Sequence, residues 1–218
     1  MSTPSAPARP DVVDAAAVRA AMARCLAVVE RHAAYLTRLD TVLGDGDHGD
    51  NLVIGFRAVE ATLRDLPTDA TPGEVLRAVG HRLVAAVGGA SGPLYGTAFL
   101  EAAAAAGDGP GIAAEDLGAM LTAAADGLAR RGRCAVGDKT ILDALRPAAE
   151  GFADARAGGH GPAEAMGAAV RAAARGMRAT RPLVARRGLA LRLGGRSVGH
   201  LDPGAVSCVL LLRAIADG

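Results

Sequence analysis

Four aspartates lie close together in one short stretch, and the spacing of three of them suits a divalent cation. The stretch LDTVLGDGDHGDNLVIG contains, in order, Asp40, Asp45, Asp47 and Asp50. Carboxylates crowded this closely repel one another unless a cation lies between them. Hard cations such as Mg²⁺ prefer carboxylate oxygen, and the glycines of the stretch let its backbone turn tightly. We therefore predict a magnesium site at Asp40, Asp45 and Asp47, with a solvated acidic turn as the alternative.

An EF-hand also combines aspartates and glycines in a short loop, but it requires a glutamate at its twelfth position. Counted from Asp40 or from Asp45, the twelfth residue is Asn51 or Phe56. The stretch is therefore not an EF-hand.

Composition predicts one helical domain that does not bind nucleic acid. The chain has 218 residues, of which 50% are hydrophobic and 2% aromatic, and its net charge is +1. Abundant Ala and Leu favour helices over strands, and the near-neutral charge argues against a nucleic-acid surface. No apolar run is long enough to cross a membrane, so we expect no membrane span. Three scattered cysteines without a CxxC spacing fit a cytoplasmic location.

Apolar periodicity between Gly and Pro breaks predicts an all-α fold. The first ten residues, rich in Pro, Ala and Ser, are expected to form a disordered tail, and 11–218 a single domain. No strand is expected, and 189–193 is ambiguous. Eight helices are predicted: 11–38, 51–65, 72–87, 92–106, 114–131, 139–156, 162–180 and 203–216.

The connections alternate between two kinds. Ordinary Gly- and Pro-containing turns follow the second, fourth and sixth helices. Connections with many chemically active residues follow the first, third, fifth and seventh, at 39–51, 87–93, 131–140 and 181–204. If consecutive helices run antiparallel, these four connections meet at one end of the bundle, which we call the four-loop end.

The even-numbered helices would all begin at the four-loop end. Either Asp50 or Asn51 can cap the second helix, Ser91 opens the fourth, and either Asp138 or Thr140 opens the sixth. The eighth begins with Asp202 as the cap and Pro203 in the first turn. Free N–H groups and the helix dipole make such starts suitable for phosphate oxygens.

Four motifs in the same order resemble the nucleotide-binding L subunit, or L domain, of dihydroxyacetone kinases (the DhaL family). They are LDTVLGDGDHGDNL, GGASGPLYGT, GDKTILDAL and GRSVGHLDPGA, and the resemblance covers roughly 35–210. It implies a closed barrel of eight antiparallel helices with the nucleotide site at one end, which agrees with the helix count above.

The resemblance also implies ligands for each motif. Asp40, Asp45 and Asp47 match the aspartates that hold two Mg²⁺ ions on the phosphates of ADP or ATP. The positions matching nucleotide contacts are His48, Gly49, Asn51, Ala90, Ser91, Gly132, Ile141, Asp202, Pro203 and Gly204.

The implied activity is phosphoryl transfer to dihydroxyacetone or a similar short ketose bound on a separate K subunit. In phosphotransferase-type systems an M subunit recharges the bound ADP, whereas in ATP-dependent relatives the K and L parts are fused. A homodimer is compatible with this role. Two alternatives stay open: a non-catalytic Mg-nucleotide-binding regulatory protein, and an L subunit for another short sugar such as a tetrulose.

The chain departs from the family pattern at five positions, two of which are Leu191 and Arg192, where the family has Ser and Tyr. The family has Met where this chain has Ile141, and a small or neutral residue where it has Asp50. Leu189 replaces an arginine that contacts the nucleotide, and an alkyl side chain cannot pair with phosphate. Arg187 or Arg192 is a candidate to replace that contact.

Overall fold

The computed structural model describes residues 12–217, and helices make up most of this part of the chain. The all-α prediction is confirmed, while the tail expected at 1–10 lies outside the described residues. The α-helices are α1 (Ala15–Leu43), α2 (His48–Asp65), α3 (Pro72–Ala86), α4 (Ser91–Ala106), α5 (Asp116–Gly132), α6 (Leu142–Ala157), α7 (Pro162–Ala179) and α8 (Pro203–Ala216).

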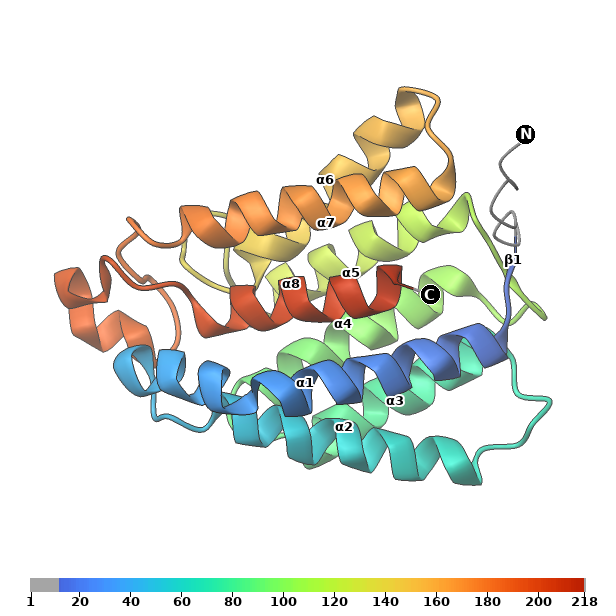
Figure 1. Ribbon diagram of the computed structural model, residues 1–218, viewed down its shortest axis with the longest axis horizontal. Helices are drawn as coiled ribbons and strands as arrows, with labels where there is room; N and C mark the ends of the chain where they lie inside the picture. The colour runs from blue at the N-terminus through green and yellow to red at the C-terminus, as the bar shows by residue number, and fades with distance from the viewer. Residues whose placement is uncertain (1–11, 218) are drawn as a thin grey trace, which may run out of the picture.

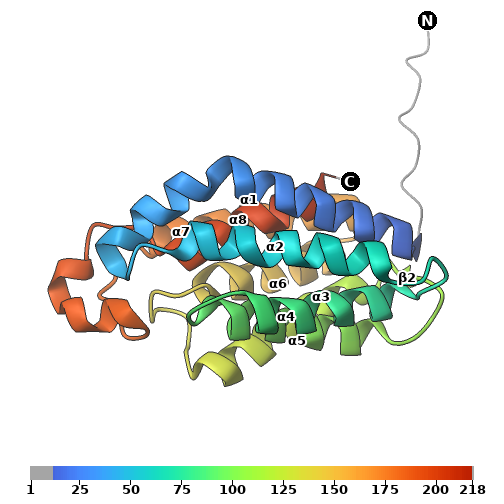
Figure 2. The same cartoon turned by 90° about the horizontal axis from the view of Figure 1, so that it is seen from below.

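The eight helices form a ring. Each contacts the next in chain order, and α8 returns to contact α1. Consecutive helices run in opposite directions, so the connections alternate between the two ends (Figures 1 and 2). The connections after α1, α3, α5 and α7 share one end, at the left of Figure 1, as the sequence predicts. The four-loop end is therefore a real feature of the fold.

Small side chains let the helices pack closely around the core. On α7, the buried residues Ala165, Ala169 and Ala173 recur at helical spacing and form its inner face. Further along α7, an added Cβ on Gly176 would lie 1.9 Å from the carbonyl oxygen of Asp143 on α6. Larger buried side chains, Phe56 among them, fill the space between the helices.

Helix α1 extends further than the predicted end at 38. It continues to Leu43 and stops at Gly44, whose N–H donates to the carbonyl oxygen of Asp40 at 2.5 Å. The reason is that neither Gly nor Pro interrupts the chain between Pro10 and Gly44. Asp40 consequently lies on the last turn of a rigid helix rather than in a loop.

The expectation of no strand was wrong in one place, where β1 (Val12–Val13) pairs antiparallel with β2 (Ile112–Ala113). Two-residue strands are too short to leave an alternating pattern in the sequence. The ambiguous segment at 189–193 belongs to a 3₁₀-helix, η1 (Leu189–Ser197), which projects beyond the helical ring at the four-loop end (Figures 1 and 2).

Two predicted helix caps were also wrong. Helix α2 begins at His48 after Asp47, so Asp50 and Asn51 lie inside its first turn. Helix α6 is preceded by Ile141 rather than by Asp138 or Thr140. The starts of α4 at Ser91 and of α8 at Pro203 are as predicted. Within residues 12–217, no helix combines the length and apolarity needed to cross a membrane.

Candidate functional site

The turn between α1 and α2 folds around the carboxylate of Asp40. Its Oδ2 accepts hydrogen bonds from the backbone N–H groups of Gly46, Asp47 and His48 at 3.0, 3.0 and 3.2 Å. Its Oδ1 lies so close to Gly44 that an added Cβ there would be 2.2 Å away. Asp40 therefore shapes the turn that carries the other aspartates, and Gly44 is required for that turn to close.

Three carboxylates converge in this turn. Asp40, Asp45 and Asp47 each offer an oxygen, and these oxygens all lie within 4.8 Å of one another. Desolvation raises the pKa of Asp47, and the neighbouring carboxylates of Asp45 and Asp40 raise it further. An all-carboxylate donor set with mutual repulsion is suited to a hard divalent cation, so these residues fit magnesium.

His48 opens α2 and lies beneath this turn. It is only 6% exposed. Its Nδ1 is 3.0 Å from the Oγ of Ser91 on α4, and its Nε2 is 2.8 Å from the Oγ of Ser207 on α8. Burial lowers the pKa of His48, against the opposing effects of the Asp40 carboxylate and the Pro203 carbonyl. The ring therefore joins three helices in its neutral form.

Gly49 and Asn51 follow on the first turn of α2. An added Cβ on Gly49 would lie 2.1 Å from the carbonyl oxygen of Ala33, so its glycine identity is explained by the close approach of α1 and α2. The side chain of Asn51 lies against the next loop, where an added Cβ on Gly88 would be 2.9 Å from its Oδ1. Asn51 thus connects the aspartate turn with the start of α4.

No side chain caps the start of α4, so its first backbone N–H groups remain available as hydrogen-bond donors. Ala90 precedes the helix, and its side chain forms no capping hydrogen bond. Ser91 is the first helical residue, half-buried, with its hydroxyl at His48. The first N–H groups of a helix have no partner within the helix and attract anions. Ala90 and Ser91 therefore lie where a phosphate could be bound.

The connection between α5 and α6 is organised by Asp143, which lies in the first turn of α6. Its carboxylate accepts hydrogen bonds from the backbone N–H groups of Gly137 and Thr140, at 2.6 and 2.7 Å. Asp138 is tied to the α7–α8 connection, because its carbonyl accepts from the N–H of Arg186 at 3.0 Å. Its carboxylate pairs with Arg187 at 3.2 Å. These bonds hold the two longest connections of the four-loop end together.

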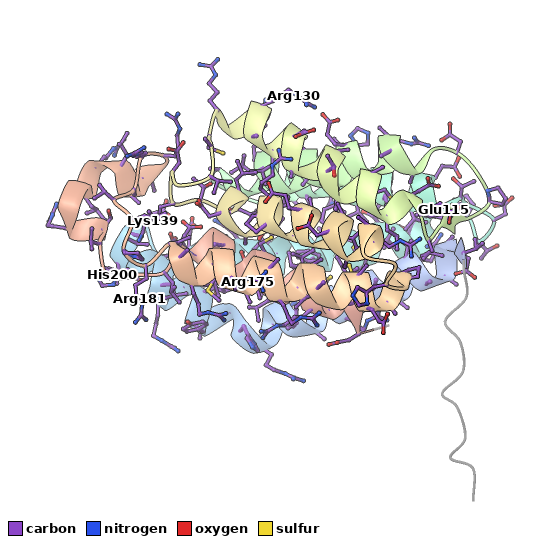
Figure 3. The ribbon with its side chains drawn as sticks, turned by 90° about the horizontal axis from the view of Figure 1, so that it is seen from above. Glu115, Arg130, Lys139, Arg175, Arg181 and His200 are labelled. Atoms are coloured by element: carbon purple, nitrogen blue, oxygen red, sulfur yellow. The ribbon has the colours of Figure 1, made fainter. Side chains whose placement is uncertain are left out.

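Lys139 adds further hydrogen bonds between the α5–α6 and α7–α8 connections. It is almost fully buried and has a positive φ of 64°. Its Nζ donates to the carbonyl oxygens of Thr180 and His200, at 2.7 and 2.5 Å. Figure 3 shows Lys139, Arg181 and His200 together at the four-loop end, far from Glu115 at the opposite end. Lys139 thus fixes both ends of the α7–α8 connection.

The last predicted nucleotide-binding turn lies beside α6. Asp202 caps α8 by accepting from the N–H of Ala205 at 2.7 Å, and Pro203 follows it in the first turn. Although part of Asp202 still reaches solvent, burial raises its pKa to about 7. Ile141 is buried against the same turn, and an added Cβ on Gly204 would lie 3.3 Å from its Cβ.

Gly132 stands apart from the aspartate turn. It is the last residue of α5, and an added Cβ there would meet Cys134 and Leu94 at 3.1 and 3.2 Å. It shares the four-loop end with the other predicted residues, but its neighbours are the α5–α6 connection and the first turns of α4.

Sequence reasoning missed four side chains that organise this end: Tyr95, Lys139, Asp143 and Ser207. All are buried and polar. For Tyr95, Lys139 and Asp143 the only available signal was a polar side chain inside a motif without an assigned partner, and Ser207 lies two residues beyond the last motif. The partners come from loops or helices elsewhere in the chain in most cases, so only the fold reveals them.

Comparison with known proteins identifies the family of the chain. The family model described as the DAK2 domain matches residues 42–217. Over 195 residues the chain is 42% identical to the ADP-binding subunit DhaL of PEP-dependent dihydroxyacetone kinase 2 of Listeria innocua, covering 88% of each chain. It is 37% identical to the corresponding DhaL subunit of Escherichia coli, covering 89% of this chain and 92% of that protein.

A solved structure shares the fold. The chain superposes on the C. freundii dihydroxyacetone kinase in complex with AMP-PNP and Mg²⁺ with a TM-score of 0.69 and 25% identity. The match covers 100% of this chain but only 36% of that one. By fold, by family model and by identity to full-length relatives, the chain belongs to the DAK2 domain family, alongside the DhaL ADP-binding subunits of dihydroxyacetone kinases.

Proposed function

We propose that this chain is the nucleotide-binding, phosphoryl-transferring subunit of a cytoplasmic dihydroxyacetone kinase. It holds Mg-ADP or Mg-ATP at the four-loop end and passes the phosphoryl group to dihydroxyacetone on a separate K subunit. The observation that carries the proposal is the convergence of Asp40, Asp45 and Asp47 to within 4.8 Å, beside the start of α4.

Each group of predicted site residues at the four-loop end has a role in this proposal. Asp40, Asp45 and Asp47 would hold two Mg²⁺ ions, which when bound offset the negative charge on the transferring phosphoryl group. Ser91 and the open N–H groups of α4 would orient phosphate oxygens. The remaining contacts to the nucleotide would come from His48, Gly49, Asn51, Ala90, Gly132, Ile141, Asp202, Pro203 and Gly204.

Positive charge near the four-loop end supports an anionic ligand. Between 178 and 201, from the end of α7 through the connection to α8, the sequence contains six arginines and no acidic residue. Arg181 lies at the four-loop end itself (Figure 3). A basic surface beside the site raises the local concentration of phosphate-bearing molecules.

The length of the relatives supports separate partners. The Listeria innocua and Escherichia coli proteins are named as ADP-binding subunits of PEP-dependent kinases, and this chain covers 88% and 92% of them. We therefore infer that the ketose is bound on a separate K subunit. We further infer that an M subunit recharges the ADP, which would then act as a bound coenzyme.

The test is the nucleotide content of the purified protein. Gently purified chain is denatured, and the released ligands are identified by chromatography and mass spectrometry. We expect ADP or ATP together with magnesium. The proposal fails if no nucleotide is found and none binds at millimolar concentration with Mg²⁺.

A second candidate acceptor is a tetrulose. The chain is 39% identical to a D-erythrulose kinase of Mycolicibacterium smegmatis, covering 90% of this chain and 34% of that protein. Phosphoryl transfer from this chain is therefore measured with dihydroxyacetone and with erythrulose, each on its own K-type partner. Binding of Mg-nucleotide without transfer to either sugar would instead support the regulatory alternative.

A further inference from the structure

A chain of buried and partly buried hydrogen bonds runs from Ser91 at the start of α4 to Tyr95 and Ser207. Ser91 Oγ is 3.0 Å from His48 Nδ1, and His48 Nε2 is 2.8 Å from Ser207 Oγ. Ser207 Oγ is 2.6 Å from the hydroxyl of Tyr95 and 3.0 Å from the carbonyl oxygen of Gly204. The nucleotide contacts implied by the family motifs include His48 and Ser91, but neither Ser207 nor Tyr95.

Counting hydrogens favours one direction for these bonds. A serine hydroxyl carries one hydrogen and accepts up to two, and a carbonyl oxygen only accepts. If Ser207 donates to Gly204, both of its other contacts must bring their own hydrogens. Tyr95 then donates to Ser207, and so does His48 from Nε2. With its hydrogen on Nε2, the neutral ring accepts at Nδ1 the hydrogen of the Ser91 hydroxyl, and all four contacts are hydrogen bonds.

The opposite arrangement satisfies fewer groups. If Ser207 donates to His48 Nε2, no hydrogen lies between Ser207 and the Gly204 carbonyl at 3.0 Å. Tyr95 could donate to Gly204 instead, but at 3.4 Å, and its 2.6 Å contact with Ser207 would then also lack a hydrogen. Buried polar contacts that lack a hydrogen are costly.

We propose that Ser207 is a positioning residue that holds His48 with its hydrogen on Nε2, and so makes the Ser91 hydroxyl donate to His48 Nδ1. Ser207 contacts the imidazole at Nε2, the nitrogen opposite the one that faces Ser91, through a side chain that is fully buried. The orientation of Ser91 at the start of α4 is thereby fixed before any ligand arrives. The effect on ADP, though not the hydrogen assignment, rests on the proposed function.

The hydrogen assignment is tested by NMR on nucleotide-free protein labelled with ¹⁵N-histidine, at pH 8. The ring signals of His48 are identified as those that disappear from the spectrum of His48→Gln. We expect Nε2 to carry the hydrogen in the parent, and the population to move towards Nδ1 in Ser207→Ala. Tyr95→Phe is the matched control: it removes a hydroxyl from the same network without touching His48, so the hydrogen should stay on Nε2. A parent ring with its hydrogen on Nδ1 overturns the proposal, even if Ser207→Ala does not fold.

The positioning role is tested by ADP dissociation with Mg²⁺ present. Ser207→Ala should release ADP about two- to tenfold faster, the range that one neutral hydrogen bond supplies. Tyr95→Phe should stay within about twofold. An unchanged tautomer or an unchanged rate in folded Ser207→Ala contradicts the proposal. If the parent does not bind ADP at all, the proposed function fails, while the NMR result still decides the hydrogen assignment.

Discussion

The ammonium nitrogen of Lys139 lies 2.5 Å from the carbonyl oxygen of His200, a residue 61 positions further along the chain. The same nitrogen is 2.7 Å from the carbonyl oxygen of Thr180. One buried cation thus holds both ends of the long connection between α7 and α8. This connection leads into the Asp202–Gly204 turn, so Lys139 supports the site without lying at the aspartates.

Lys139→Met should loosen this connection. Methionine keeps most of the side-chain length but leaves both carbonyl oxygens without their donor. Hydrogen bonds to a charged group contribute about 1.5–3 kcal/mol, so we expect the free energy of unfolding to fall by about 2–4 kcal/mol. Urea unfolding measures this loss, and hydrogen exchange should show faster exchange in residues 180–202.

Arg196→Met is the matched control, because Arg196 is an exposed cation on the same connection. Its free energy of unfolding should stay within about 0.5 kcal/mol of the parent. Equal losses in the two variants would show that Lys139 acts only through charge.

Asp45→Asn should abolish Mg-nucleotide binding while leaving the metal-free fold intact. The substitution removes one donor from the three-carboxylate cluster and also relieves repulsion there. Thermal melting in EDTA should therefore be equal to or above that of the parent, whereas the rise on adding Mg-ADP should vanish. Asp50→Asn, an exposed acid on the first turn of α2, should keep the full rise. An undiminished rise in Asp45→Asn would remove Asp45 from the metal site.

Asp202 predicts a pH dependence of stability. Burial raises its pKa from 3.8 to about 7. Between these values the folded carboxyl keeps a proton that the unfolded one releases, so its contribution to stability is present below about pH 4 and is lost as pH rises to about 7. Asn caps helices as well as Asp does but does not titrate. The difference between parent and Asp202→Asn, measured by urea unfolding in EDTA across this range, should follow that course; a flat difference would contradict it.

The sequence predicted what depends on local pattern and spacing. The alternation of ordinary turns with chemically active connections located the four-loop end before any motif was identified. The three aspartates of the predicted metal site were singled out by their spacing, and their oxygens do converge to within 4.8 Å of one another. The start of α2 was missed, because side chains of Asp and Asn can either cap a helix or serve a neighbouring turn, as Asp40 does.

The remaining site residues could not be predicted, because their partners are distant in sequence. Ser207 lies 159 residues from His48, and Tyr95 lies 112 residues from Ser207. Nothing near these positions in the sequence distinguishes them from ordinary buried hydroxyls. Lys139 likewise has no local partner, and its two acceptors are backbone carbonyls, which every residue has.

The position of Leu189 leads to the last prediction. Leu189 is 43% exposed and begins η1, at the position where the family resemblance implies an arginine in contact with the nucleotide. Arg187 is already engaged in an ion pair, because its Nε is 3.2 Å from the carboxylate of Asp138. It is therefore a poor replacement for that arginine. Arg192 is a better replacement, since residues three apart in a 3₁₀-helix lie on the same face and it follows Leu189 by one turn.

Leu189→Arg should slow ADP dissociation if the contact is missing from this chain. A hydrogen bond to a charged group contributes about 1.5–3 kcal/mol, which corresponds to about ten- to a hundredfold in rate at 1.4 kcal/mol per decade. We expect this slowing, with Arg192→Ala within about twofold of the parent. Release of fluorescent ADP from the three proteins in Mg²⁺ measures it. If Arg192→Ala instead releases ADP much faster and Leu189→Arg is unchanged, Arg192 already supplies the contact from one turn further along η1.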